Sequence, residues 1–378
     1  MPLLLTWLVL DRSSRRWYLP PLVGLLLAWV QVGDRIAMVV GVLPLIVACL
    51  AQVIRGVARR EPLSRSWYEL ALAGAAFCSV AVASLAVSIT GRLGGYAVRP
   101  LGINMASPAS IPGNLRLTGN GVLLLYGIGP QPGLSTAQAA FALVHLAGLA
   151  LAAVALGLAI WQFPRQDSIV LQVLTVAILA NLALYALSST AGPGYLNREI
   201  AAVLPLGAVL AGRLLAGRML AAQPAPAGTS GQPSVALAAV LGGLLVCYAA
   251  ALGYGVAQPS VPAEQQDLAG WLADHQLQTG LGGAESNIVT LDSRERTRVL
   301  VTTFGPTRAR PDAYQSQASW YDPARHDANF VVSAGTPGEI TYVPQQHLVA
   351  DFGRPARTYH FRDYTIAVWD KNLLDDLR

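Results

Sequence analysis

Residues 169–189 read IVLQVLTVAILANLALYALSS, an apolar stretch without a charged side chain. A helix needs roughly 20 apolar residues to cross the hydrocarbon core of a bilayer. The stretch is therefore predicted to be a transmembrane helix, and it indicates an integral membrane protein.

Six further apolar stretches occur before and after this one. With it they predict seven spans, at about 18–33, 36–54, 67–89, 136–161, 169–189, 199–220 and 234–256. The composition agrees, because 53% of the 378 residues are hydrophobic and only 12% are charged, whereas soluble domains carry roughly 25% charged residues. A single soluble enzyme is excluded.

Charge divides the chain into two parts. Residues 1–256 hold 15 Arg and 6 Asp or Glu, whereas residues 257–378 hold 11 Lys or Arg and 15 Asp or Glu. We therefore expect a transmembrane domain at 1–256, with a Pro/Gly/Ser-rich cytoplasmic linker at 221–233, and a separate domain at 257–378. The excess Arg lies in short loops between spans, so nucleic acid is not an expected partner.

The loop arginines also predict an orientation. If alternate loops starting with the first are placed inside, ten Arg lie in the cytoplasm and five outside. Positively charged loops favour the cytoplasmic side. The chain is thus predicted to be a multi-pass protein of the cytoplasmic membrane with its C-terminal 122 residues outside the cytoplasm.

The C-terminal part has the pattern of a small α+β domain. Leu268, Trp271, Leu272 and His275 have the spacing of one helix face. Strands are expected at 287–291, 297–303, 329–334, 340–343, 356–361 and 364–369, in a mostly antiparallel sheet. The glycines at 280–283 are expected to lack the strand before and helix after that mark a nucleotide-binding loop.

The segment 90–135 contains too many Pro and Gly residues for a spanning helix and is expected to form a re-entrant or interfacial outer loop. Its Arg92, Arg99 and Arg116 are candidates to bind an anionic headgroup through charge-assisted hydrogen bonds, and anchoring to lipid phosphates is the alternative. Asp34, in an outer turn, is a candidate general base, with helix capping as the alternative.

A second outer loop, GPGYLNRE at 192–199, is expected to begin a helix. Tyr195, Arg198 and Glu199 are candidate substrate-binding residues there, because a helix start attracts anions, with an Arg–Glu pair as the alternative. His145 lies within the fourth span, where an ionisable group is a functional candidate or a buried histidine with a polar partner. Gly148 and Gly157 allow close packing of helices.

No metal site is assigned from the sequence. Cys49, Cys78 and Cys247 all lie in apolar stretches, so neither a disulfide framework nor a Cys-X-X-Cys site is available. Asp322, Arg325, His326 and Asp327 gather in one short segment that can hold a metal or a sugar, although its Asp-Pro start favours a turn.

Several stretches together resemble a known family. They are VGVLPLIVA (40–48), GRLGGYAVRPL (91–101), REIAAVLPLGAVLAGRLLA (198–216), LAGWLADHQLQTGLGG (268–283), ASWYDPARHDANFVV (318–332) and FGRPARTYHFRDYTIAVWDKNLL (352–374). The chain resembles the C-terminal portion of large actinobacterial membrane proteins similar to GT-C glycosyltransferases, the superfamily of protein mannosyltransferases and aminoarabinose transferases.

The resemblance implies an enzyme that takes sugar from a polyprenyl-phosphate donor and delivers it to a cell-envelope acceptor at the outer face. It also implies an acidic base in an early outer loop and, in some members, a divalent cation. Residues 1–10 are expected to be the end of a preceding helix, so that the catalytic loop would be missing, and Asp34 does not match the family's acidic motif.

Two functions remain open from the sequence. One is a glycosyltransferase-like protein, whole or truncated, and the other is a non-enzymatic membrane-anchored scaffold or cell-envelope binding protein. A transporter is a weaker third reading, because neither inverted repeats nor paired broken helices are found.

Overall fold

The structure is a computed structural model of residues 1–378. It describes residues 2–96, 104–128, 136–189, 191, 198–221, 233–258, 265–284, 286–304, 308–314, 316–334 and 342–377, with side chains left out at 136–138, 215–238, 240 and 241. The predicted linker at 221–233 lies almost entirely outside these residues.

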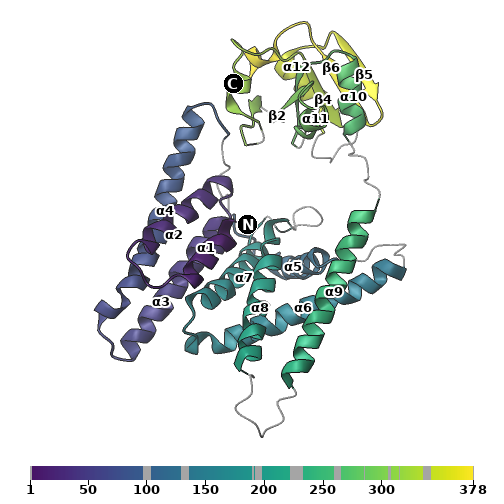
Figure 1. The fold of residues 1–378 in the computed structure, drawn as a ribbon. Helices are drawn as coiled ribbons and strands as arrows, with labels where there is room; N and C mark the ends of the chain where they lie inside the picture. The colour runs from purple at the N-terminus through teal and green to yellow at the C-terminus, as the bar shows by residue number, and fades with distance from the viewer. Residues whose placement is uncertain are drawn as a thin grey trace. The chain divides into compact units, whose positions relative to one another are not determined.

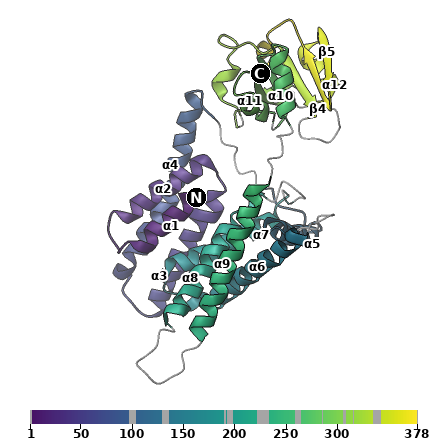
Figure 2. The ribbon, with the colours of Figure 1, turned by 45° about the vertical axis from the view of Figure 1, so that its right-hand side comes forward.

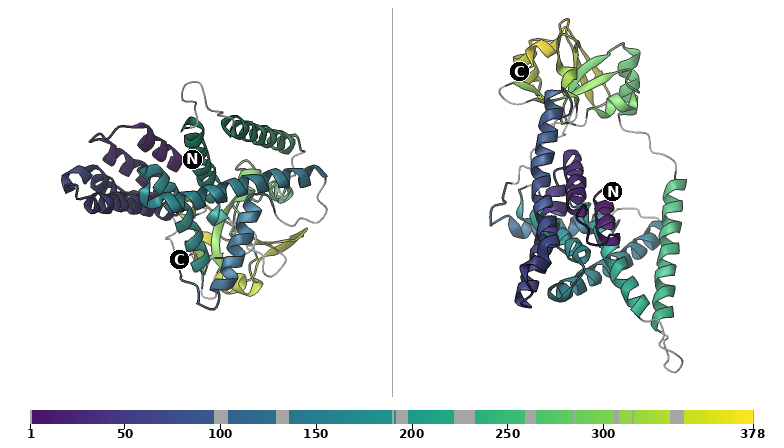
Figure 3. Two further views of the ribbon diagram at one scale, coloured as in Figure 1. Left: turned by 90° about the horizontal axis from the view of Figure 1, so that it is seen from below. Right: turned by 60° about the vertical axis from the view of Figure 1, so that its left-hand side comes forward.

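The chain forms two compact units. Unit 1 comprises residues 1–84 and 100–258, and unit 2 comprises residues 85–99 and 259–378. Helix α4 (Trp67–Arg92), dark blue in Figure 3, contains residues of both units. Two backbone hydrogen bonds within unit 2 join the segment just after α4 to residues 318 and 319. Ser319 N donates to Gly94 O (2.9 Å), and Ala318 N donates to Gly95 O (3.3 Å).

Each of the seven predicted apolar stretches contains a helix (Figure 1). The helices before residue 258 are α1 (Pro2–Arg12), α2 (Leu19–Gly33), the π-helical η1 (Met38–Val42) with α3 (Leu43–Ala58), α4, α5 (Ile111–Leu125), α6 (Thr136–Gln162), α7 (Ile169–Leu187), α8 (Val203–Ala221) and α9 (Pro233–Ala257).

Among the described residues, four helical segments are long and apolar enough to cross a membrane. They are Met38–Ala58, Leu63–Arg92, Ala139–Arg165 and Ile169–Leu187, whereas the apolar segments Leu19–Gly33 and Gly242–Ala257 are shorter. The uncovered faces of these helices are apolar, as shown by Phe77 (73% exposed), Leu143 (68%) and Ile54 (68%). Apolar surface of this extent indicates contact with lipid.

Unit 1 has its core where α3, α7 and α8 meet. Leu45 and Cys49 of α3, Val173 and Leu174 of α7 and Leu210 of α8 are fully buried in one cluster. Helix α5 attaches to the end of α7, because Asn114 Nδ2 donates to Ser188 O (2.9 Å) and Ser189 N donates to Asn104 O (2.8 Å). Part of the 90–135 segment is thus helical, and the N-terminal position of Pro112 in α5 explains why this proline does not break it.

Unit 2 is built on one mixed sheet in the order β3-β2-β1-β4-β6-β5. The strands are β1 (Thr279–Gly282), β2 (Arg298–Phe304), β3 (Ala309–Pro311), β4 (Phe330–Ala334), β5 (Arg357–Phe361) and β6 (Tyr364–Val368). Three of the five pairings are antiparallel, as expected, but β1 pairs in parallel with both β2 and β4.

Two apolar layers cover the sheet. Helices α10 (Gln266–Asp274) and α11 (Ile288–Asp292) contribute Leu268, Leu272 and Val289 to one layer, and α12 (Gln345–Phe352) contributes Leu348 and Phe352 to the other (Figure 2). The amphipathic helix predicted at 263–278 is confirmed as α10.

Two of the strands expected in unit 2 are not found as expected. The stretch 287–291 is not a strand but contains most of α11, a short apolar run that periodicity alone cannot distinguish from a strand. The expectation for the glycines at 280–283 is not contradicted, because Gly280 and Gly282 lie within β1 itself and α11 begins only at Ile288. Residues 342 and 343, at the end of the strand expected at 340–343, are not extended into the sheet.

Candidate functional site

The structure places Asp34 in an exposed turn at the C-terminal end of α2. Its Oδ1 accepts a hydrogen bond from Ile36 N (2.9 Å), and its own N–H donates to Val30 O (3.0 Å). This is the geometry of a turn residue that satisfies the backbone at a helix end.

The candidate substrate-binding residues are not brought together by any described contact, except Arg198 and Glu199. Arg198 Nε lies 3.5 Å from Glu199 Oε1, in a short 3-10 turn that precedes α8, so the helix does not begin at these residues as expected. Arg92 is exposed at the end of α4. Arg99 and Tyr195 lie outside the described residues.

Unit 1 contains a groove of about 900 Å³ between α5, α6, α8 and α9. Most of its lining is aliphatic or glycine, including Leu151 of α6, Pro205 of α8 and Leu245 of α9. Figure 2 shows α9 beside α6 and α8. No Asp, Glu, Lys or Arg lines it within the part of the chain that the structure describes, so it suits an uncharged, apolar ligand.

Three side chains with polar groups line this groove, namely Tyr126, His145 and Tyr248, and we call it the Tyr–His groove. The His145 and Tyr248 rings are stacked, with centroids 5.5 Å apart and an interplanar angle of 21°. No described residue hydrogen-bonds the two hydroxyls or the imidazole nitrogens, so these groups can bind polar atoms of a ligand.

Glycines create the close approaches on which the groove depends. A Cβ at Gly148 of α6 would overlap the hydroxyl of Tyr248 on α9. Gly127, just after α5, has a left-handed backbone with φ +70°, and a Cβ there would lie 2.8 Å from His145 Nδ1. The predicted packing role of Gly148 is confirmed, whereas that of Gly157 is not, because a Cβ there would meet nothing within 4 Å. Any larger residue at Gly148 would fill or distort the groove.

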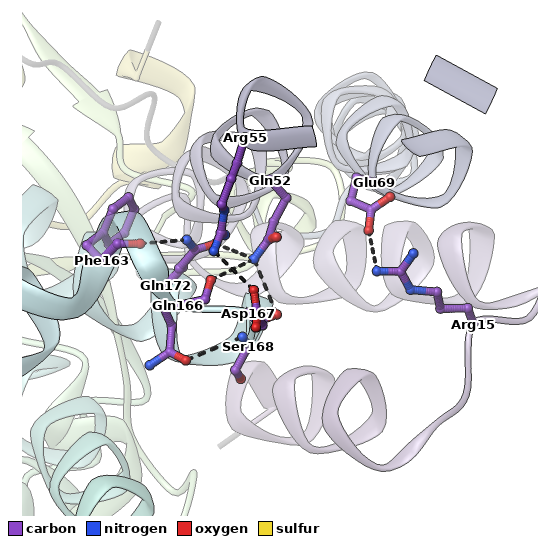
Figure 4. Close-up of polar contacts among 9 residues, drawn as sticks. All are labelled: Arg15, Gln52, Arg55, Glu69, Phe163, Gln166, Asp167, Ser168 and Gln172. Atoms are coloured by element: carbon purple, nitrogen blue, oxygen red, sulfur yellow. Dashed lines mark hydrogen bonds and ion pairs between the residues drawn. The ribbon is translucent and has the colours of Figure 1, made fainter. Parts of the chain in front are cut away.

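A second polar cluster lies where α3 meets the start of α7 (Figure 4). Gln52 Nε2 donates to Gln172 Oε1 (3.0 Å) and to Gln166 O (3.1 Å), and Gln172 Nε2 donates to Phe163 O (3.1 Å). Arg55 pairs with Asp167 at 3.2 Å. These groups satisfy the backbone of the turn between α6 and α7, so we interpret the cluster as structural.

Buried Glu69 forms another polar contact in the same view. Its Oε1 lies 2.7 Å from Arg15 Nη2, whereas its buried Oε2 has no hydrogen-bond partner among the described residues (Figure 4). The pair joins the segment after α1 to the start of α4. One ion pair does not define a site for a ligand, and we assign it no chemistry.

Metal ligands do not gather in the described residues, where no three of His, Cys, Asp and Glu are close enough to hold an ion. The 322–327 segment is a turn, in which Asp322 accepts from Ala324 N (3.1 Å) and pairs with Arg325 (3.3 Å). The turn favoured by its Asp-Pro start is confirmed.

Sequence reasoning found only one member of the Tyr–His groove, His145. Tyr126 and Tyr248 were missed, because aromatic residues at helix ends and in apolar stretches are common and carry no pairing information. The residue spacing within one helix indicates its faces but not which residue of another helix packs there.

Comparison of the chain with models of protein families, with curated proteins and with solved structures finds no match in any of the three. The family resemblance therefore stays a prediction, and functional arguments depend on the geometry of the groove.

Proposed function

We propose that this chain is a multi-pass protein of the cytoplasmic membrane that binds a polyprenyl-phosphate-linked sugar in the Tyr–His groove and takes part in glycosyl transfer at the outer face. The observation that carries the proposal is the groove itself, with about 900 Å³ of mostly apolar lining and three aromatic side chains that offer polar groups. The sequence resemblance independently suggests the same lipid.

The character of the lining favours a lipid chain over a soluble substrate. A water-soluble ligand would lose its hydration in an aliphatic groove without gaining enough hydrogen bonds, and burying an unpaired polar group costs about 1–3 kcal/mol. An isoprenoid chain has no polar groups to dehydrate and therefore avoids this cost. The Tyr126 and Tyr248 hydroxyls and the His145 imidazole then serve the few polar atoms near the phosphate.

The proposal includes seven spans and an extracytoplasmic C-terminal unit. Ion pairs within unit 1 support the predicted sidedness, because Arg15 pairs with Glu69, Arg55 with Asp167 and Arg213 with Asp11. Each pair joins residues assigned to the cytoplasmic half of the membrane domain. In this orientation, the residues that line the groove on α6 and α8 run from the outer half of each helix to its middle.

The phosphate of the donor requires positive charge at the mouth of the groove. Arg198 shortly precedes Leu204 and Pro205, the first residues of α8 that line the groove. Its side chain is 63% exposed. We assign Arg198 to the phosphate, and we assign no residue as the base of the transfer.

A non-enzymatic cell-envelope binding protein is the second candidate function. Unit 2 favours it, because this unit has its own sheet and two buried apolar layers and so offers a module that binds without chemistry. Sugar transfer from a labelled polyprenyl-phosphate donor by the purified protein would favour the first function, and binding without transfer would favour the second.

The lipid proposal is tested by two matched substitutions in α6. Gly148→Leu places a side chain where the Tyr248 hydroxyl lies, whereas a Cβ at Gly157 meets nothing within 4 Å, so Gly157→Leu serves as the matched control. Both replace Gly by Leu in the same helix, so both raise helix propensity by a similar amount. Binding of undecaprenyl phosphate to the full chain in nanodiscs would be measured by native mass spectrometry.

We expect saturable binding by the unchanged protein and by Gly157→Leu, and binding at least tenfold weaker in Gly148→Leu. Equal affinity in the two variants, or no saturable binding by the unchanged protein, would overturn the assignment of the lipid to this groove.

A further inference from the structure

Unit 2 has a second cavity, on the face of the sheet that α12 covers. Alternation along the strands and the pairing register place Ser333 of β4, Thr365 of β6 and His360 of β5 in one row across three neighbouring strands. Thr358 stands next to His360 on the same face of β5. Ser333 is buried, whereas Thr358 and His360 are exposed because β5 is the edge strand, so the polar row runs from the core to an open edge that a ligand can reach.

The row forms the floor of a cavity of about 260 Å³, which we call the β5–β6 cavity. Its other walls come from Gln345, Leu348 and Val349 of α12, and from Tyr342 just before that helix. The Ser333 hydroxyl holds this wall in place. It accepts a hydrogen bond from Val343 N (2.8 Å) and donates one to Val343 O (3.1 Å).

Four polar groups in the lining are available to a ligand. No described residue hydrogen-bonds the hydroxyls of Tyr342 and Thr358, the side-chain amide of Gln345, or Nε2 of His360. The other ring nitrogen, His360 Nδ1, lies 3.3 Å from Thr365 Oγ1, which fixes the orientation of the ring. Donors and acceptors thus surround the cavity on several sides.

Charge and size restrict the ligand. No Asp, Glu, Lys or Arg lines the cavity among the described residues, which disfavours an ionic ligand. At about 30 Å³ for each water, its volume corresponds to about nine waters, which is less than the pockets that hold drug-sized molecules. Leu348, Trp369 and the Tyr342 ring add apolar surface between the polar groups.

We propose that the β5–β6 cavity binds one neutral sugar residue. A pyranose ring presents hydroxyls around its rim and C–H groups on its faces, which matches hydroxyl, amide and imidazole groups interleaved with aromatic and aliphatic surface. The inference goes beyond the lipid proposal and does not depend on it, because the cavity lies entirely within unit 2.

The test uses the full chain in detergent and a panel of methyl glycosides of glucose, mannose and galactose, with glucuronic acid as a charged probe. Saturation-transfer NMR measures binding over a concentration series. The double variant Tyr342→Phe/Thr358→Val removes two free hydroxyls with little change of shape. Tyr359→Phe is the matched control, because it removes a hydroxyl from the same strand on the opposite face.

We expect saturable binding of at least one neutral glycoside and weaker binding of glucuronic acid. Each lost hydrogen bond should weaken the neutral glycoside by about three- to tenfold, so the double variant should lose most of the signal and Tyr359→Phe should keep it. Absence of saturable binding by every neutral glycoside, or equal binding by the double variant and the control, would overturn the proposal. Neither result would bear on lipid binding or glycosyl transfer by unit 1.

Discussion

The two cavities of this chain differ in the chemistry of their linings. The Tyr–His groove is large and almost wholly apolar and lies among helices with exposed apolar faces, whereas the β5–β6 cavity is about 260 Å³ and is lined by hydroxyl, amide and imidazole groups on a sheet. Helices that face lipid can border an apolar groove without cost, because their surroundings are equally apolar. The two regions therefore suit different classes of ligand.

Loss of the unit 2 core should have the largest effect and should separate the two regions. Phe330 is fully buried, and its ring packs over Gly280 of the neighbouring strand, where a Cβ would overlap it. Phe330→Ala should destabilise unit 2 by about 3–5 kcal/mol. Hydrogen exchange of the full chain should show lost protection in β1, β4 and β6, with undecaprenyl phosphate binding retained.

The matched control for that variant is Leu291→Ala, because Leu291 is 74% exposed. It should leave exchange in the sheet unchanged. If Phe330→Ala abolished lipid binding while the helices of unit 1 kept their protection, the two regions would not be independent.

High pH should affect unit 2 to a smaller degree. Burial raises the pKa of Tyr321 to about 12, while hydrogen bonding with Ser316 and Asp312 acts in the opposite direction. The hydroxyl donates to Val301 O. Because the folded-state pKa lies above the ordinary value of about 10, the stability that this group contributes is complete below pH 10 and is lost as the pH rises towards 12.

A folded-state pKa of Tyr321 of about 12, against an ordinary value of about 10, corresponds to about 3 kcal/mol at most. Chemical unfolding at pH 9 to 12, followed by exchange in β2, should show this loss in the unchanged protein and a shallower loss in Tyr321→Phe. An equally steep loss in Tyr321→Phe would mean that other groups cause it.

The smallest effect should come from Arg198→Ala, which tests the proposed phosphate contact at the groove. Because the side chain is 63% exposed, its removal should change the stability of unit 1 by less than about 0.5 kcal/mol. Undecaprenyl phosphate should bind about three- to tenfold more weakly at low salt, with a smaller difference at high salt. Undecaprenol, which lacks the phosphate, should bind the variant and the unchanged protein alike, and an equal loss for both lipids would contradict a phosphate contact.

The helical part was largely predictable from the sequence, because hydropathy and helix periodicity report local structure. Each predicted apolar stretch contains a helix, although α8 begins at Val203 and not near 199. In unit 2 the prediction failed at Thr279–Gly282, where glycines have low strand propensity. Both positions need glycine. The Phe330 ring occupies the space of a Cβ at Gly280, and Ser286 and Val299 occupy that space at Gly282.

One wrong element had consequences for the whole sheet. Reading 287–291 as a strand removed the helix between β1 and β2, and parallel neighbours require such a crossover. The parallel centre was therefore not expected. The cavities were not predictable for a related reason, because they form only where segments distant in sequence pack together. Tyr248 contacts His145, and Ser333 lies beside Thr365, only in the folded chain.

The central claim is that the Tyr–His groove binds a polyprenyl phosphate. The most direct measurement is photo-crosslinking of the full chain in native-like membranes with a diazirine-bearing polyprenyl phosphate, followed by peptide mapping with and without excess unlabelled lipid. The account predicts that competed crosslinks concentrate on α6, α8 and α9 near His145, Pro205 and Tyr248. Crosslinks spread evenly over the exposed faces of the helices, including Phe77 of α4, and unaffected by competitor would contradict it.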